Sequence, residues 1–171
     1  SAKKIINTYT EEMLAKILFM YGELRNSRAI AHTIVEARAD GVIETSFQLR
    51  KLLQKFLPKA KAHKILAQIF QAIRIEVNEE LEVLKEFLIQ TPNLLTPEGR
   101  LSIISYHSLE DRLVKRFIRT GLFDGEPEKD FFGNFDVPLM KLGKLIIPNK
   151  EEIRKNNRAR SAKLRVAKLK T

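Results

Sequence analysis

The feature that most limits how this chain can fold is a long stretch of helical spacing in its middle. Apolar residues follow one another at intervals of 4, 3, 4, 4, 3 and 4 positions, at Leu66, Phe70, Ile73, Val77, Leu81, Leu84 and Leu88. These intervals place the apolar side chains on one face of an α-helix. They predict a single helix of roughly 25 residues, about 38 Å long at 1.5 Å per residue. A helix of that length can connect two separately folded parts of a protein.

The residues before this helix predict a small helical unit. Apolar side chains recur at helical spacing in three short segments, at about 10–21, 27–38 and 45–57. Thr10 precedes two glutamates and is a predicted N-cap. Thr45 and Gln48 have the spacing of a capping box, in which each side chain accepts a hydrogen bond from the other residue's backbone N–H. Three short helices are therefore expected to pack against one another.

The residues after the long helix predict strands. Residues 101–106 (LSIISY) form a short, β-branched run of the kind found in buried strands, and helical spacing follows from about 109 to 118. A second strand is expected at about 144–147. The closing residues, 162–169, partly alternate between apolar and basic, as in a strand, but three of them also suit one helical face: Ala162, Val166 and Leu169. Periodicity leaves both structures open for this segment.

A polar motif, ISYHSLEDR, lies between the predicted strand and helix at residues 104–112. Ser108 and Asp111 have capping-box spacing, so helix initiation explains both of them. The position of the motif favours a second interpretation, because ligands of parallel α/β sheets bind outside the carboxyl ends of the strands. There Tyr106 and His107 are candidates for ligand contact, and the His107 imidazole is also a candidate acid or base. Both interpretations stay open.

The formal net charge is +10, and most of the excess lies near the end of the chain. Residues 150–171 hold nine Lys or Arg side chains and two Glu side chains. Such a basic block is either a surface that contacts nucleic-acid phosphates or a solvated tail. Charge alone does not separate these two interpretations.

Composition argues against several classes of protein. The chain has no cysteine, and His32, His63 and His107 lack the spacing of metal ligands, so we expect neither a disulfide nor a metal site. No apolar run approaches the roughly 20 residues of a membrane span, and the first residues lack the apolar core of a signal peptide; we expect a soluble, cytoplasmic protein with no membrane partner. The hydrolase pattern G-x-S-x-G is missing, and no two glycines are separated by a single residue, which excludes a nucleotide-cradling G-x-G loop.

Two stretches carry a resemblance to a known family. Residues 99–117 (GRLSIISYHSLEDRLVKRF) and 157–166 (NRARSAKLRV) resemble the MraW family of ribosomal RNA methyltransferases. Shorter stretches resemble the family in the same order along the chain: 7–12 (NTYTEE), 21–23 (YGE), 34–38 (IVEAR), 43–45 (IET) and 70–78 (FQAIRIEVN). The resemblance therefore extends over nearly the whole chain.

This resemblance implies an enzyme that transfers a methyl group from S-adenosylmethionine to the exocyclic N4 of a cytidine in the decoding region of 16S rRNA. It also implies an α/β fold, in which a helical domain that helps to recognise the substrate interrupts a Rossmann-like methyltransferase domain. Residues 1–62 are then most of the helical insertion domain. Residues 63–171 are the C-terminal part of the methyltransferase domain, with an incomplete sheet whose last strand is the closing segment. The implied partner is 16S rRNA or the small ribosomal subunit, and a homodimer is left open.

The family's cofactor-binding parts all come before its helical insertion. They are a glycine-rich loop, an acidic residue that holds the ribose and a target-base motif. Because the chain begins after them, the resemblance implies a C-terminal fragment that has no cofactor-binding residues and is inactive alone. The chain also departs from the family at residues 64–68, which read KILAQ where the family commonly has His-Pro-Ala-Thr-Arg. Any role of that arginine does not carry over.

Within such an enzyme, five residues are candidates for the wall that faces the substrate: Arg74, Asn78, Tyr106, His107 and Glu110. Of these, His107 and Glu110 are the candidates for a catalytic role. Four residues of the basic block are candidates for contacts with RNA phosphates: Arg158, Arg160, Lys163 and Arg165. The alternative is a non-catalytic RNA-binding module with a helical head and a basic C-terminal tail. The missing glycine loop favours this alternative, and the resemblance along the chain disfavours it.

Overall fold

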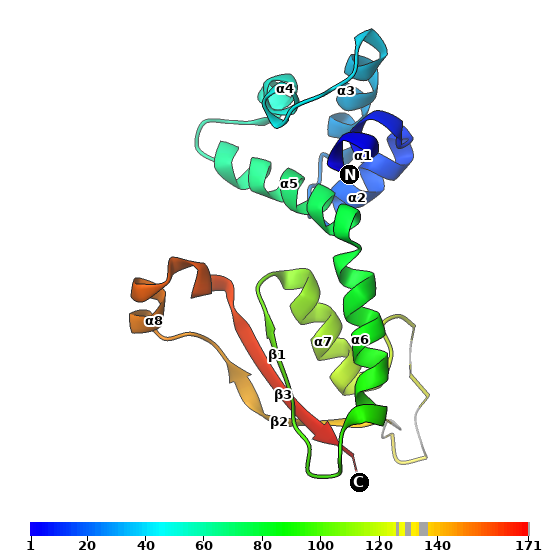
Figure 1. The fold of residues 1–171 in the computed structure, drawn as a ribbon, viewed down its shortest axis with the longest axis vertical. Coiled ribbons are helices and arrows are strands. Elements are labelled where there is room, and N and C mark those ends of the chain that lie inside the picture. Colours follow the sequence, from blue (N-terminus) through cyan, green and yellow to red (C-terminus); the bar gives the residue numbers. More distant parts are fainter. Residues whose placement is uncertain (126, 129–130, 134–136, 171) are drawn as a thin grey trace. The chain divides into compact units, whose positions relative to one another are not determined.

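The chain is a mixed α/β protein that divides into two compact units, Ser1–Glu80 and Leu81–Thr171 (Figure 1). This division comes from a computed structural model, which describes residues 1–125, 127–128, 131–133 and 137–170. Among these residues, no helix has the length and apolar character needed to span a bilayer. The first unit is helical and the second contains a sheet.

The helical unit consists of α1 (Ala2–Thr8), α2 (Glu11–Met20), α3 (Ser27–Asp40), α4 (Ser46–Leu52), the 3₁₀ helix η1 (Leu53–Phe56) and α5 (Ala62–Asn78). The Thr10 side chain accepts a hydrogen bond from the Met13 backbone N–H, and Thr45 and Gln48 form the capping box that their spacing predicts. Helix α1 was not predicted, because its seven residues are too few to show a helical repeat. Local hydrogen bonds thus set the helix starts.

The helical unit packs around one apolar core. The fully buried members of this core include Leu14, Leu18, Ile30, Ile34, Leu53 and Ile69. Helix α5 belongs to this core, since its residues Ile69, Ala72 and Ile73 are all buried there. For this reason the boundary between the two compact units falls after Glu80. The division of the family's domains after residue 62, which the resemblance implies, stays a prediction.

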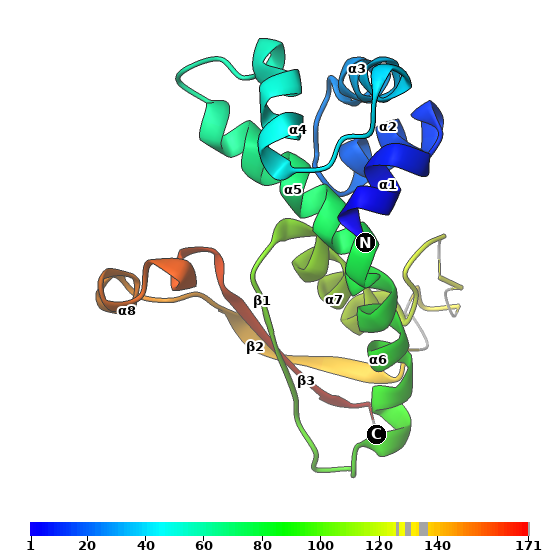
Figure 2. The same cartoon turned by 45° about the horizontal axis from the view of Figure 1, so that its top comes forward.

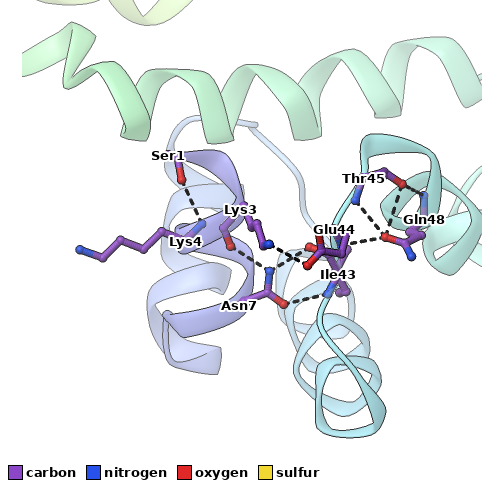
Figure 3. Close-up of polar contacts among 8 residues, drawn as sticks. All are labelled: Ser1, Lys3, Lys4, Asn7, Ile43, Glu44, Thr45 and Gln48. Carbon is purple, nitrogen blue, oxygen red and sulfur yellow. Dashed lines mark hydrogen bonds and ion pairs between the residues drawn. The ribbon is translucent and has the colours of Figure 1, made fainter.

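The Asn7 side chain fixes α1 to the segment between α3 and α4 (Figure 3). Its Nδ2 donates to the carbonyl oxygen of Ile43, and its Oδ1 accepts from the backbone N–H of Ile43, both over 2.9 Å. Beside it, the Lys3 ammonium lies 2.6 Å from the Glu44 carboxylate. Stretches 7–12 and 43–45, which both resemble the MraW family, are therefore in direct contact. The two hydrogen bonds of Asn7 link them.

The predicted long helix is interrupted, so the expectation of a single helix is wrong. Helix α5 ends at Asn78, and α6 (Glu80–Leu94) begins two residues later. Between them Glu79 has left-handed backbone angles (φ 52°, ψ 33°), and its N–H still bonds the carbonyl of Ile75. Apolar spacing does not reveal such a break, because both helices bury one face and a single left-handed residue leaves the intervals unchanged.

The sheet unit contains α6, β1 (Leu101–Ser105), α7 (Ser108–Thr120), β2 (Leu139–Ile146), α8 (Lys150–Lys155), the 3₁₀ helix η2 (Asn157–Ser161) and β3 (Lys163–Leu169). The strand order is β1-β3-β2, and β3 is antiparallel to both neighbours. The ambiguous closing segment is therefore the middle strand. The basic block is not a tail, because its second half lies inside the sheet.

Helices α6 and α7 lie on the same side of the sheet (Figures 1 and 2) and share its apolar core. That core includes Leu88 of α6, Val114 and Phe117 of α7, and Leu101, Leu139 and Ala167 of the strands. On the other side of the sheet, Ile104, Tyr106 and Met140 are 56%, 55% and 42% exposed. Strand β1 is thus only half buried, contrary to expectation, because it lies at an edge of the sheet with one face uncovered.

Candidate functional site

The strand ends bring the candidate residues of the sheet unit to one edge. Because β1 and β2 are both antiparallel to β3, they are parallel to each other, with β3 inserted between them. Their carboxyl ends meet beside the start of β3, where Ser105 is opposite Lys163 and Ile146 is opposite Leu164. We call this edge, with Tyr106, His107, Glu110 and residues 157–163, the carboxyl edge. Ligands of parallel sheets bind at such an edge.

His107, and not Ser108, is the N-cap of α7. Its Nδ1 accepts a hydrogen bond from the Glu110 backbone N–H, and the Glu110 carboxylate accepts from the backbone N–H of His107 (3.4 Å) and of Tyr106 (2.8 Å). The predicted capping box of Ser108 and Asp111 is therefore wrong. The box forms one residue earlier because Asp111 binds elsewhere, as described below.

The Glu110 carboxylate also faces the imidazole of its capping partner. Nε2 of His107 lies 3.1 Å from Oε1 of Glu110, without hydrogen-bond geometry, and the two side chains are 12% and 27% exposed. Burial by itself raises the pKa of Glu110, but contacts with the His107 imidazole and the Tyr106 backbone N–H outweigh it, so the pKa lies below its ordinary value. Glu110 is therefore an ionised hydrogen-bond acceptor at neutral pH. Catalytic roles for His107 and Glu110 stay predictions.

Asp111 binds two of the predicted phosphate-contacting cations. Its carboxylate accepts from Nε and Nη2 of Arg165 at 2.7 and 3.2 Å and from Nζ of Lys163 at 3.1 Å. The side chains of Asp111 and Arg165 are only 11% and 13% exposed, whereas Lys163 is 39% exposed. Both cations therefore neutralise a carboxylate between α7 and β3. A phosphate would have to compete with Asp111 for both cations, and their role as RNA contacts stays a prediction.

The other two predicted phosphate contacts lie on the exposed turn η2. Arg158 and Arg160 are both solvent-exposed, and η2 leads directly into β3 at the carboxyl edge. In the part of the chain that the structure describes, neither guanidinium has an ion-pair partner. These two residues stay candidates for RNA contact.

Two candidates lie in the helical unit and bind the same carboxylate. Arg74 donates to both carboxylate oxygens of Glu80, at 2.8 and 3.0 Å, and Asn78 donates to one of them at 3.0 Å. Both side chains thereby bind across the break between α5 and α6 at Glu79. Their role toward a substrate stays a prediction.

Ser105 is a residue at the carboxyl edge that the sequence did not single out. It is 2% exposed, and its Oγ has no hydrogen-bond partner among the described residues. A buried polar atom without a partner is uncommon in native proteins. Its position could have identified it in the sequence, because Leu101, Ile103 and Ser105 alternate along the strand and the serine is the polar member of this inward-facing series. With the Glu110 carboxylate and the cations of η2, the edge offers donors and acceptors for a polar ligand.

Comparison with known proteins decides the family. A sequence model of the MraW methylase family matches residues 1–170. The chain belongs to this family. Proteins named ribosomal RNA small subunit methyltransferase H are similar to it: those of Christiangramia forsetii, Flavobacterium johnsoniae and Cytophaga hutchinsonii are 64%, 59% and 52% identical over 98% of the chain. The chain spans 56%, 55% and 56% of these relatives, which is little more than half of their length.

The two longest stretches that resemble the MraW family lie side by side. Stretch 99–117 forms β1 and most of α7, and stretch 157–166 forms η2 and the start of β3. Strands β1 and β3 pair, and Asp111 binds Arg165 across the two stretches. Much of the family's sequence pattern in this unit is thus explained by the packing of α7 on the sheet.

We expect His107→Ala to lower the free energy of unfolding by about 1 kcal/mol, because it removes the N-cap of α7. His107→Asn should change it by less than about 0.5 kcal/mol, since asparagine is a preferred N-cap residue. Urea unfolding of the chain, followed by far-UV circular dichroism, measures both. An equal loss in the two variants would mean that contact between the imidazole and Glu110, and not capping, stabilises the helix.

Proposed function

We propose that the chain is the substrate-facing and sheet-closing part of a methyltransferase that uses S-adenosylmethionine to methylate N4 of a cytidine in 16S rRNA. The observation that carries this proposal is the match of residues 1–170 to the MraW methylase family, together with relatives named ribosomal RNA small subunit methyltransferase H. The activity, substrate and cofactor of the longer relatives are assigned to this chain only by this proposal.

The geometry of the sheet unit supports the proposal. An antiparallel strand inserted between two parallel strands suits the end of a Rossmann-like sheet, to which further parallel strands are added beside β1. Among the described residues, strand β1 has no partner on its outer edge and one of its faces is exposed, which leaves room for this addition. The carboxyl edge would then continue into the ligand-binding edge of the larger sheet.

The residues of this chain do not fit the cofactor. S-adenosylmethionine carries a positively charged sulfonium, whereas two cavities that border α7 in the sheet unit are lined mainly by Lys and Arg, with Asp124 as an acidic residue in one of them. No G-x-G loop is present in the sequence. We therefore expect the portion of the relatives that this chain does not span to hold the cofactor, and the chain alone to be inactive.

The proposed partner is 16S rRNA or the small ribosomal subunit. A cytoplasmic location follows from that partner, because ribosomal subunits assemble there. The proposal requires neither a metal ion nor a membrane, and a homodimer remains open. The exposed cations Arg158 and Arg160 also suit the alternative of a non-catalytic RNA-binding module.

The experiment that tests the proposal joins this chain to the portion of its relatives that it does not span. The purified protein is incubated with S-adenosylmethionine labelled in the methyl group and with small ribosomal subunits from a strain that lacks the modification. We expect label in 16S rRNA, and N4-methylcytidine after digestion to nucleosides and mass spectrometry. Methylation at another atom would contradict the N4 assignment. Binding of RNA without methyl transfer would favour the non-catalytic alternative.

A further inference from the structure

A cationic cavity lies between α7 and β2, outside the residues of the carboxyl edge. Its volume is about 320 Å³. Helix α7 contributes two of its cations and β2 contributes two more: Lys115, Arg119, Lys141 and Lys144. We call this cavity the α7–β2 cleft.

The four cations of the cleft are solvent-exposed. In the described part of the chain none of them has an ion-pair partner, and no carboxylate lines the cleft. A fifth cation, Arg165, also lines it, but Asp111 neutralises that charge. Lys115 and Arg119 are four residues apart on α7, where like charges repel each other. Such a concentration of one charge favours a polyanionic ligand.

The floor of the cleft is apolar. Ile118 of α7 and Leu145 of β2 contribute apolar side chains, whereas Leu142 and Val166, paired on the sheet face that carries Met140, line the cleft with their backbone. A cavity with cations around an apolar floor matches a ligand that has both phosphates and a flat hydrophobic ring. A base of a single-stranded nucleic acid is such a group, because it can leave its stack and bury one face.

A bulge in β2 brings residues of that strand to the cleft. Leu142 is opposite Val166 and Ile146 is opposite Leu164, so β2 advances by four residues while β3 advances by two. Within the bulge Gly143 has φ +65°, a conformation that strains other residues. Bulges re-aim the side chains beside them. Lys144 and Leu145, which follow the glycine directly, line the cleft as a result.

Protection of the sheet edge does not explain the whole arrangement. Lysines on an edge strand such as β2 prevent pairing with another sheet, and this accounts for Lys141 and Lys144. It does not account for Lys115 and Arg119, which lie on a helix, or for the apolar floor between the two pairs.

We propose that the α7–β2 cleft binds a single-stranded segment of the RNA substrate, with the four cations on its phosphates and one base against the apolar floor. This proposal rests on the proposed function for the choice of RNA. It adds a binding surface separate from Arg158 and Arg160 of the carboxyl edge.

Fluorescence anisotropy with a labelled, single-stranded RNA of about 12 nucleotides tests the proposal. The cleft variant carries Lys115→Gln, Arg119→Gln, Lys141→Gln and Lys144→Gln. The control variant removes the same number and kinds of exposed cation from the helical unit: Arg50→Gln, Lys51→Gln, Lys55→Gln and Lys59→Gln. We expect the cleft variant to bind more than about tenfold more weakly, with a salt slope lower by roughly 3, since each phosphate contact on a single strand contributes about 0.7. The control should lose less than threefold.

The floor of the cleft is tested by Leu145→Ser, which changes an exposed side chain and no charge. We expect weaker binding of the same RNA, by about threefold, with an unchanged salt slope. Unchanged affinity in this variant would contradict the binding of a base against the apolar floor. Equal losses in the cleft and control variants would overturn it, because net charge would then explain binding.

The methyl-transfer experiment separates this proposal from the proposed function. If the longer protein forms N4-methylcytidine but the cleft variant binds RNA like the wild type, the cleft proposal fails and the function stands. If the cleft variant loses RNA binding but no methylated cytidine forms, the cleft proposal stands and the function fails.

Discussion

Replacement of Asp111 by alanine is expected to lower the free energy of unfolding of the sheet unit by about 3 kcal/mol. The carboxylate is 11% exposed and binds Arg165, which is itself 13% exposed. Without Asp111, the guanidinium would stay in the interface between α7 and β3 as an uncompensated charge. Urea unfolding, followed by hydrogen exchange of the amides of β1, β3 and α7, measures the loss.

The matched control is Glu151→Ala, which removes a different ion pair of the same unit. Glu151 and Lys155 are 2.7 Å apart but 64% and 69% exposed, so the loss should be about 0.5 kcal/mol or less. Adding Arg165→Met to Asp111→Ala should restore part of the stability, because no buried charge then lacks a partner. Similar losses in Asp111→Ala and Glu151→Ala would show that the Asp111 pair has no special role.

The same pair predicts how stability depends on pH. Burial raises the pKa of Asp111, but the hydrogen bonds from Arg165 and Lys163 outweigh it, so the pKa in the folded protein lies below its ordinary value. The stabilisation is therefore fully present above the unfolded pKa of about 4 and is lost as pH falls through the lower, folded value. The difference in stability between the wild type and Asp111→Ala should accordingly shrink below about pH 4.

The chain alone is expected to show no saturable binding of S-adenosylmethionine in titration calorimetry. In Rossmann-like folds a glycine-rich loop lets the backbone approach the bound cofactor closely. The seven glycines of this chain are dispersed, with no two separated by a single residue. The cations that line the cavities beside α7 also repel the sulfonium.

The positive control for this titration is the longer protein that contains the portion of the relatives outside this chain. It should bind both S-adenosylmethionine and its demethylated product, S-adenosylhomocysteine. A saturable micromolar site on the chain alone would contradict the assignment of the cofactor site to the other portion.

The family resemblance and the starts of α2 and α4 could be predicted from the sequence. Thr10 caps α2, and Thr45 and Gln48 form the capping box of α4, where their spacing places them. These features depend on hydrogen bonds between residues at most four positions apart. A short window of the sequence therefore contains both the donor and the acceptor of each hydrogen bond.

The candidate site was predicted only in part. Tyr106, His107 and Glu110 do meet at the carboxyl edge beside η2, but Lys163 and Arg165 bind Asp111, and Arg74 and Asn78 bind Glu80. Charge and spacing identify a basic side chain without showing which carboxylate will neutralise it. For Arg165 that carboxylate lies 54 positions away in the chain.

What the sequence determined by itself is therefore the family, the capping signals and the presence of a helical part followed by a strand-containing part. The tertiary structure alone decided three further points. It made the closing segment the middle strand, because β1 and β2 supply its hydrogen-bond partners from distant positions. It moved the N-cap of α7 from Ser108 to His107, because β3 holds Asp111. It interrupted the long helix at Glu79, because the apolar faces of α5 and α6 are buried in two different cores, and periodicity records only that a face is apolar and not what covers it.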